Sequence, residues 1–342
     1  MKQNTWNLLV CGLSHDHVWG ELEHWNRIAN VTVLGAGEAD ARLRGKFAEM
    51  FPAAELFESW EQALSQLGDA ADIVQIAAPN ALHPAIAMGA FQHQCHVITE
   101  KPMASTLAGA DAMLQASLSA RKSLMVNWPI AWMSAFQLFQ QHIENGTIGN
   151  LSYIRYRSAH NGPLEIGCDP AFVAWLYDEQ LNGAGAFMDY CCYGSVIAAH
   201  HLGLPHTVTG IRGKLAKAYD ICDDNAVVTM QYDSAMAVAE ASWTQVTGYL
   251  GANPVAYGSL GAVGLERGIL VLLDGKDNRT EIEPPTPLFP FRNGPENFIN
   301  HLETGEPIFG VCDAKTSRNA QAILEAGLIA SKTGHSERAR SF

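Results

Sequence analysis

Basic residues are scarce in this sequence of 342 residues. Its 22 Lys and Arg side chains are outnumbered by 35 Asp and Glu side chains, which gives a formal net charge of −13. A surface with this excess of negative charge repels phosphate backbones and anionic lipid headgroups. We therefore exclude nucleic acid and membrane surfaces as the main partners.

Long hydrophobic runs and patterned cysteines are missing as well. No stretch approaches the roughly 18 uncharged apolar residues that a transmembrane helix needs. Residues 1–6 are polar and lack the basic start and apolar core of a signal peptide. The seven cysteines form no Cys-x-x-Cys pattern and are too sparse for a disulfide framework. These absences predict a cytoplasmic protein with reduced thiols.

The first half of the sequence alternates short apolar runs with segments of helical spacing. The expected strands cover residues 6–11, 31–36, 72–78, 95–99 and 124–127. The expected helices cover residues 18–28, 41–50, 60–67, 82–91 and 106–121. Such alternation indicates βαβ units and a parallel sheet. We predict a dinucleotide-binding Rossmann domain over residues 1–126, within an α/β protein.

Residues 95–103 are the stretch around which this half is organised. They read Cys-His-Val-Ile-Thr-Glu-Lys-Pro-Met, and the strand is expected to end at Thr99. Ligands of open α/β sheets bind beyond the carboxyl ends of the strands, so Lys101 is a cation at the expected site of chemistry. A surface Lys paired with Glu100 explains these residues equally well.

An incomplete glycine fingerprint follows the first strand. The pattern G-x-G-x-x-G requires glycines at positions 12, 14 and 17, and the sequence has Gly12, Ser14 and His17. The start of the following helix still offers amide groups and a positive dipole end to a pyrophosphate. His15 and His17 are possible metal ligands, but no third ligand lies nearby in the sequence, so we predict no metal.

Acidic and amide side chains follow the next two strands. Glu38 can accept hydrogen bonds from the adenosine ribose and repels a 2′-phosphate, which favours NAD over NADP. Arg42 and Arg44 could instead bind that phosphate. Asn80 is either a helix N-cap or a polar contact near the nicotinamide. The predicted cofactor contacts are Gly12, Leu13, Ser14, His15, Asp16, Glu38, Ala78, Asn80, His83, Glu100, Lys101, Asn127 and Trp128.

The second half reads as consecutive strands after a change of composition at residues 127–129. Strands are expected over residues 151–160, 208–214, 226–232 and 235–243, with a hairpin around residues 274–275. Strands joined by short turns predict a large, mostly antiparallel sheet with helices on one face. We place this α/β domain at residues 127–342 and regard the open face of its sheet as an interface.

A glycine-rich start at residues 183–185 leads into a helix that is expected to reach residue 202. Asp189 and Tyr193 are four residues apart and share one helical face, which suits proton transfer. A half-buried Tyr near an exposed Asp is the plainer alternative. The residues expected to contact a polyol are Arg157, His160, Trp175 and Tyr177, of which Trp175 and Tyr177 also suit a core.

Taken together, these motifs resemble the Gfo/Idh/MocA family, the glucose-fructose oxidoreductase and inositol dehydrogenase type of sugar oxidoreductase. The resemblance rests on Asn80, His83, Glu100-Lys101-Pro102, Trp175, Asp178, the helix with Asp189, and Glu240-Ala-Ser-Trp243. It implies dimers or tetramers formed through the open sheet face, and Lys101 and Asp189 as catalytic residues. Two departures are Tyr193, where many members carry a His as general acid or base, and the degraded fingerprint.

The sequence therefore predicts hydride transfer between NAD(P) and a secondary alcohol or ketone of a sugar, polyol or related ring alcohol. A phenol with its usual pKa near 10 is a poor base at neutral pH, and a nearby ammonium lowers that pKa. We expect Lys101 to do so, Tyr193 to exchange the proton, and Asp189 to hold the pair. An NAD-dependent glycoside hydrolase or lyase with transient oxidation, and a non-catalytic sensor, remain alternatives.

Overall fold

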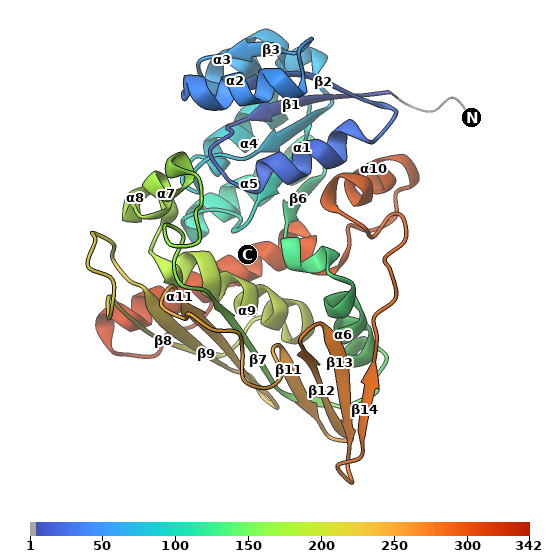
Figure 1. Ribbon diagram of the computed structural model, residues 1–342, viewed down its shortest axis with the longest axis vertical. Helices are drawn as coiled ribbons and strands as arrows, with labels where there is room; N and C mark the ends of the chain where they lie inside the picture. The colour runs from blue at the N-terminus through green and yellow to red at the C-terminus, as the bar shows by residue number, and fades with distance from the viewer. Residues whose placement is uncertain (1–4) are drawn as a thin grey trace. The chain divides into compact units, whose positions relative to one another are not determined.

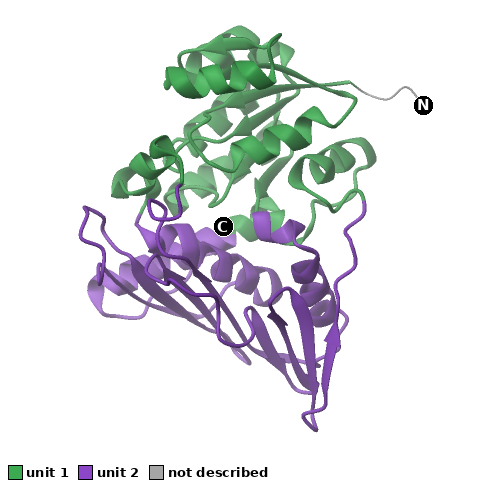
Figure 2. Ribbon diagram, viewed as in Figure 1, with its two compact units in different colours: residues 1–128, 168–183, 289–318 green, residues 129–167, 184–288, 319–342 purple. Residues whose placement is uncertain are grey.

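The computed structural model describes residues 5–342. The chain folds into two compact units (Figure 2). Unit 1 contains residues 1–128, 168–183 and 289–318, and unit 2 contains residues 129–167, 184–288 and 319–342. Residues 1–4, part of the polar stretch considered above, lie outside the described residues. Among the described residues, no helix has the length and apolar character needed to cross a membrane.

Unit 1 is built on a six-stranded parallel sheet (Figure 1). Its order is β3-β2-β1-β4-β5-β6, the doubly wound arrangement typical of dinucleotide-binding sheets. The strands are β1 (Trp6–Cys11), β2 (Val31–Gly37), β3 (Glu55–Phe57), β4 (Ile73–Ile76), β5 (His96–Glu100) and β6 (Leu124–Asn127). The predicted parallel sheet is confirmed, with β3 as an additional edge strand. Strand β5 begins and ends one residue later than predicted.

The helices of unit 1 begin where the sequence supplies capping side chains. Asp40, Ser59 and Thr106 each accept hydrogen bonds from backbone amides of the helices that follow them. The helices are α1 (Val18–Asn26), α2 (Ala41–Met50), α3 (Trp60–Leu67), α4 (His83–Gln92), α5 (Leu107–Ala120), α7 (Pro170–Leu176), α8 (Glu179–Asn182) and α10 (Gly294–Thr304). The short 3-10 turns are η1 (Gly68–Ala70) and η3 (Gly310–Cys312). Helices α7 and α8 were not predicted.

Unit 2 is built on an eight-stranded sheet of order β14-β13-β12-β11-β7-β10-β9-β8. Only the β7–β10 pair is parallel, and the other neighbours are antiparallel. The strands are β7 (Leu151–Ala159), β8 (Thr207–Gly213), β9 (Asn225–Gln231), β10 (Met236–Ser242), β11 (Val255–Gly258), β12 (Gly261–Glu266), β13 (Ile269–Asp274) and β14 (Arg279–Ile282). The predicted large, mostly antiparallel sheet is confirmed.

Helix α9 (Ala186–Leu202) covers one face of this sheet. A Cβ atom on Gly194 would lie 2.5 Å from the Cβ atom of Ala239 in β10, so the helix and the sheet are in close contact. Helices α6 (Ser134–Glu144) and α11 (Ala314–Thr333) and the turn η2 (Pro129–Trp132) complete the helical elements. The strand register places a row of side chains on the opposite face, namely Ile211, Val227, Glu240 and Arg157.

Candidate functional site

The loop between β1 and α1 is the first part of the candidate site in unit 1. Gly12 has a φ of +87°, and a Cβ atom there would lie 2.7 Å from the Cβ atom of Ala78. The position therefore requires glycine. The Glu38 carboxylate accepts hydrogen bonds from the backbone amides of Leu13 at 2.7 Å and Asp40 at 3.0 Å. This carboxylate thus holds the loop against the end of β2.

A cavity of about 540 Å³ lies beside this loop. Four predicted cofactor residues line it: Gly12, Ser14, Glu38 and Ala78. Asp40 and Glu61 add acidic side chains to its wall. Helix α1 begins at Val18, after its N-cap His17, and no side chain of the described residues forms a cap hydrogen bond there.

Helices α7 and α8 form another wall of the same cavity, through Ala171, Ala174, Trp175 and Leu181. Trp175 Nε1 donates a hydrogen bond to the Ser14 carbonyl oxygen at 3.2 Å. Two guanidinium nitrogens of Arg42 lie 2.6 and 2.7 Å from the Asp169 carboxylate, just before α7. The predicted polyol contact Trp175 therefore lies against the loop between β1 and α1 in unit 1.

Asn80 and Asp16 also form hydrogen bonds with residues of the segment 168–183. Asn80 Nδ2 donates to Asn182 Oδ1 at 2.8 Å, and the Asp16 carboxylate accepts the Asp169 amide at 2.9 Å. Both predicted cofactor residues thus help to attach a segment that lies far away in the sequence. Tyr177, predicted as a polyol contact, is the C-cap of α7 in unit 1.

A buried polar cluster lies at the carboxyl ends of β5 and β6. Glu100 Oε2 is 3.0 Å from Nδ1 of His17, and Glu100 Oε1 accepts a hydrogen bond from Nδ2 of Asn127 at 3.3 Å. Lys101 follows directly and is buried. Burial, together with the charge of Glu100, raises the pKa of the Glu21 carboxyl group in α1. With its pKa raised to about 8, the Glu21 carboxyl group is mainly protonated at neutral pH.

Three further predicted cofactor residues are buried in this region. Burial, followed by the charges of His17 and Lys101, holds the pKa of His15 well below its usual value, so His15 is neutral. His83 lies between the carbonyl oxygens of Ala78 at 3.0 Å and Met103 at 3.2 Å. Its ring thus connects the end of β4 with the segment after Lys101. Trp128 is a core residue whose Nε1 donates to Ser317 Oγ at 3.0 Å.

Asp189 and Tyr193 lie one turn apart on α9 in unit 2, and both are buried. Asp189 Oδ2 accepts a hydrogen bond from Trp243 Nε1 at 3.3 Å. The backbone amide of Phe187 donates to Asp223 Oδ1 at 2.7 Å, and that of Gly185 donates to Oδ2 of the same carboxylate at 3.1 Å. Asp223 therefore fixes the start of the helix that carries Asp189 and Tyr193.

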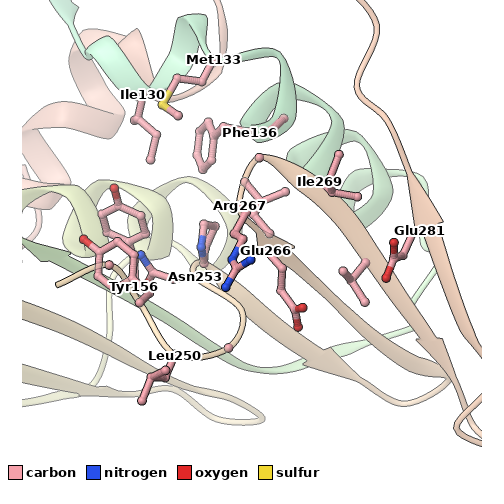
Figure 3. A pocket seen from close by; sticks show the side chains of 18 of the residues that line it. Ile130, Met133, Phe136, Tyr156, Leu250, Asn253, Glu266, Arg267, Ile269 and Glu281 are labelled. Atoms are coloured by element: carbon pink, nitrogen blue, oxygen red, sulfur yellow. The ribbon is translucent and has the colours of Figure 1, made fainter.

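A second cavity, of about 740 Å³, lies in unit 2 (Figure 3). Tyr156 lines it, and the ring of Tyr156 lies 6.0 Å from that of Tyr193 between centroids. Burial, and then the phenols of Tyr193 and Tyr249, raise the pKa of Tyr156, which keeps it protonated as a hydrogen-bond donor. Phe136 and Asn253 also face this cavity. It thus combines aromatic and polar side chains.

The sequence analysis did not predict these cavity residues, although the alternation of side chains along a strand could have indicated Tyr156. Tyr156 precedes Arg157 on β7, so the two side chains point to opposite faces of the sheet. Arg157 is 2.9 Å from Glu240 Oε2 and 2.9 Å from Gln245 Oε1 on the face away from α9. His160 contacts the ring of Tyr190 with centroids 4.9 Å apart. Neither Arg157 nor His160 lines this cavity.

Comparison with known proteins adds independent information. Residues 8–128 match the model of an oxidoreductase family with an NAD-binding Rossmann fold, GFO/IDH/MocA, and residues 136–264 match a GFO/IDH/MocA C-terminal domain. A scyllo-inositol 2-dehydrogenase (NADP(+)) of Bacillus subtilis is 28% identical over 201 residues, 58% of each chain. An uncharacterised oxidoreductase of Escherichia coli is 30% identical over 195 residues, 54% of each chain.

These matches therefore span little more than half the length of the two curated relatives. A solved structure extends the comparison to nearly the whole fold. The aldose-aldose oxidoreductase of Caulobacter crescentus, complexed with glycerol, superposes with a TM-score of 0.82 at 19% identity. That alignment covers 98% of this chain and 100% of the other, so the two proteins share a fold.

Proposed function

The chain belongs to the Gfo/Idh/MocA oxidoreductase family, and from that premise we propose that it transfers hydride between a nicotinamide dinucleotide and a secondary alcohol or ketone of a sugar, polyol or related ring alcohol. The observation that carries this proposal is the cavity lined by Gly12, Ser14 and Glu38, beside the loop that leads into α1. The substrate class is that of relatives of this chain, which include inositol and xylose dehydrogenases.

The residues around this cavity fit a dinucleotide. Gly12 brings the backbone of the loop close to Ala78, and a side chain there would collide with that residue. Such a tight turn after the first strand is the role of the first glycine in dinucleotide-binding loops. The uncapped start of α1 supplies a positive dipole end for the phosphates. Glu38, at the end of β2, suits the adenosine ribose hydroxyls. Bound here, the nicotinamide would accept or donate the hydride.

The charges in the same cavity favour NAD over NADP. Glu38, Asp40 and Glu61 line it and would repel a 2′-phosphate. Arg42 is engaged by Asp169, and Arg44 donates to the carbonyl oxygens of Glu38 at 2.6 Å and of Ala39 at 2.8 Å. Binding NADP would require these arginines to exchange their present partners for the phosphate.

The chain's own residues must handle the hydroxyl proton of the substrate. We assign proton exchange to Tyr193, orientation of Tyr193 to Asp189, and polarisation of the substrate oxygen to Lys101. This assignment is supported by the burial of all three side chains and by the position of Lys101 after a central parallel strand. The bond between Trp243 and Asp189 supports an orienting role for this carboxylate.

The cavity in unit 2 is the candidate substrate pocket. Its volume of about 740 Å³ lies within the ordinary range for small-molecule sites. Tyr156 and Phe136 offer ring faces for the apolar side of a sugar. The Asn253 amide pairs with the backbone of Arg157 at 2.8 Å in both directions, which leaves it one N–H and one oxygen lone pair for a hydroxyl group. Tyr156 also contacts Tyr193, so the proposed proton carrier adjoins this cavity.

The open face of the unit 2 sheet is the proposed surface for association into dimers or tetramers. Ile211, Met236 and Tyr257 are exposed on strands β8, β10 and β11. Exposed apolar side chains on one sheet face are typical of subunit interfaces. A second copy of the chain would remove them from water.

The test is an absorbance assay for reduced nicotinamide with NAD⁺ or NADP⁺ and a panel of aldoses, inositols and sugar acids. We expect reduction with at least one member of the panel, and faster reduction with NAD⁺. Silence across the panel, combined with NAD released on denaturation, would contradict a net dehydrogenase. That result would instead support the hydrolase or lyase with transient oxidation.

A further inference from the structure

Three side chains with metal-binding groups meet at the C-terminal ends of two helices in unit 2. Glu144 is the last residue of α6, and His200 and His201 lie in the last turn of α9. Their ligand atoms, one from each side chain, all lie within 4.8 Å of one another. A helix C-terminus carries partial negative charge, so both helix ends favour a cation at this position.

An ordinary ion pair explains only part of this cluster. His200 Nε2 lies 2.9 Å from Glu144 Oε1, which satisfies these two groups. The rings of His200 and His201 lie 4.8 Å apart between centroids. His201 Nε2, however, is shielded from solvent and has no hydrogen-bond partner among the described residues. A buried ring nitrogen without a partner is costly, and a bound metal ion would satisfy it.

Another histidine cluster and a His–Asp pair lack this combination of features. His15, His17 and Glu100 also bring three ligand groups together, but they lie at the positive end of α1 and beside Lys101. That environment disfavours a further cation. His206 Nε2 lies 3.0 Å from the carboxylate of Asp233, but among the described residues no third His, Cys, Asp or Glu joins this pair to form a metal-binding group.

We propose that Glu144, His200 and His201 form a binding site for a divalent transition-metal ion. Two imidazoles and one carboxylate are a ligand set that proteins use for zinc, with a fourth position open to water. The neutral ring nitrogens and the carboxylate oxygen bind the ion as lone-pair donors, with no redox step.

A metal ion at this site would link the C-terminal ends of α6 and α9. Tyr193 lies seven residues before His200, which is about 10 Å along the helix axis. The ion is therefore placed to stabilise the helix that carries Asp189 and Tyr193, rather than to take part in hydride transfer. This proposal does not depend on the enzymatic function proposed above.

The test is a titration of the tag-free, chelator-treated full chain with Co²⁺, followed by visible absorption, and with Zn²⁺, followed by calorimetry. We expect one equivalent of metal per chain and a higher melting temperature with Zn²⁺ than with chelator. Glu144→Gln and His200→Gln should each weaken binding by at least about tenfold, because each removes one ligand. Circular dichroism in chelator checks that the variants fold.

Matched substitutions decide between this site and the alternatives. His206→Gln disrupts a His–Asp pair of similar geometry and should leave metal affinity unchanged. If the wild-type chain binds no equivalent of metal, the proposal is overturned and the cluster is only the pair of His200 and Glu144. Loss of binding in His17→Gln, with binding retained in His200→Gln, would move the metal to unit 1 and would also overturn it.

Discussion

Replacing Tyr193 by Phe tests the proposed chemistry most directly. Tyr193 is 9% exposed, and its ring contacts those of Tyr156 and Tyr190 with centroids 6.0 and 6.3 Å apart. Phe keeps this ring and its contacts and removes only the hydroxyl group. We therefore expect a loss of about 1 kcal/mol or less in the free energy of unfolding, the net worth of one hydrogen bond.

The expected effect on turnover is much larger. A positioned general acid or base contributes roughly 10²- to 10⁴-fold to the rate. That range corresponds to about 3–5 kcal/mol in the activation free energy. If Tyr193 exchanges the proton, kcat should fall by this amount while the dissociation constant of NAD stays within about threefold, because the predicted cofactor contacts lie in unit 1.

The assay combines steady-state kinetics across a pH series with separate measurement of NAD binding by fluorescence. Tyr190→Phe is the matched control, because Tyr190 lies on the same helix, is half-buried, and also contacts a neighbouring ring. The control should retain kcat within about threefold. Retention of normal kcat by Tyr193→Phe, or an equal loss in both variants, would refute the assignment of the proton to Tyr193.

Three further predictions concern the cofactor, the buried acid and the sheet face. Glu38→Gln should reduce the preference for NAD⁺ over NADP⁺ by about tenfold in kcat/KM, because it removes a charge that repels the 2′-phosphate. An unchanged ratio of the two kcat/KM values would show that the charge of Glu38 does not set this preference. Burial and the charge of Glu100 raise the pKa of Glu21 from 4.5 to about 8. Because the folded state binds this proton more tightly than the unfolded state, the free energy of unfolding should decline as pH rises between these values. Glu21→Gln should flatten this decline in melting temperature, and a decline equal to that of the wild type would exclude Glu21 as its source. Ile211→Glu should shift the molar mass measured by light scattering towards the monomer, whereas an unchanged mass would place the interface elsewhere.

The parts of the fold that were predictable are those with local signals. Apolar runs followed by helical spacing predicted the parallel strands, and β5 places Lys101 at their carboxyl edge, as expected. The assignment of residues 168–183 to unit 1 was not predictable. It depends on Arg42 and Asp169, which are 127 residues apart, and on Trp175 and Ser14, which are 161 residues apart. Neither pairing leaves a periodic trace in the sequence.

The same distinction applies to the candidate site in unit 2. The spacing of Asp189 and Tyr193 predicted their shared position on a helix, which the structure has as α9. The carboxylate that holds the start of this helix comes from Asp223, 36 residues after Phe187. Ser, Thr, Asn or Asp immediately before a helix would have been a visible signal, but α9 begins after Gly185. Its cap is therefore a tertiary contact that local reasoning could not find.

The imperfect fingerprint and the Glu-Lys-Pro motif are physically connected. The usual glycine at the third fingerprint position allows a helix to approach a strand closely, and His17 does not serve that purpose. Instead, its Nδ1 reaches Glu100, the residue before Lys101, at 3.0 Å. Each of the two motifs thus supplies one partner of a hydrogen-bonded pair at the carboxyl edge of the sheet. A side chain that looked like a defect in the cofactor loop therefore ties that loop to the strand end from which Lys101 emerges.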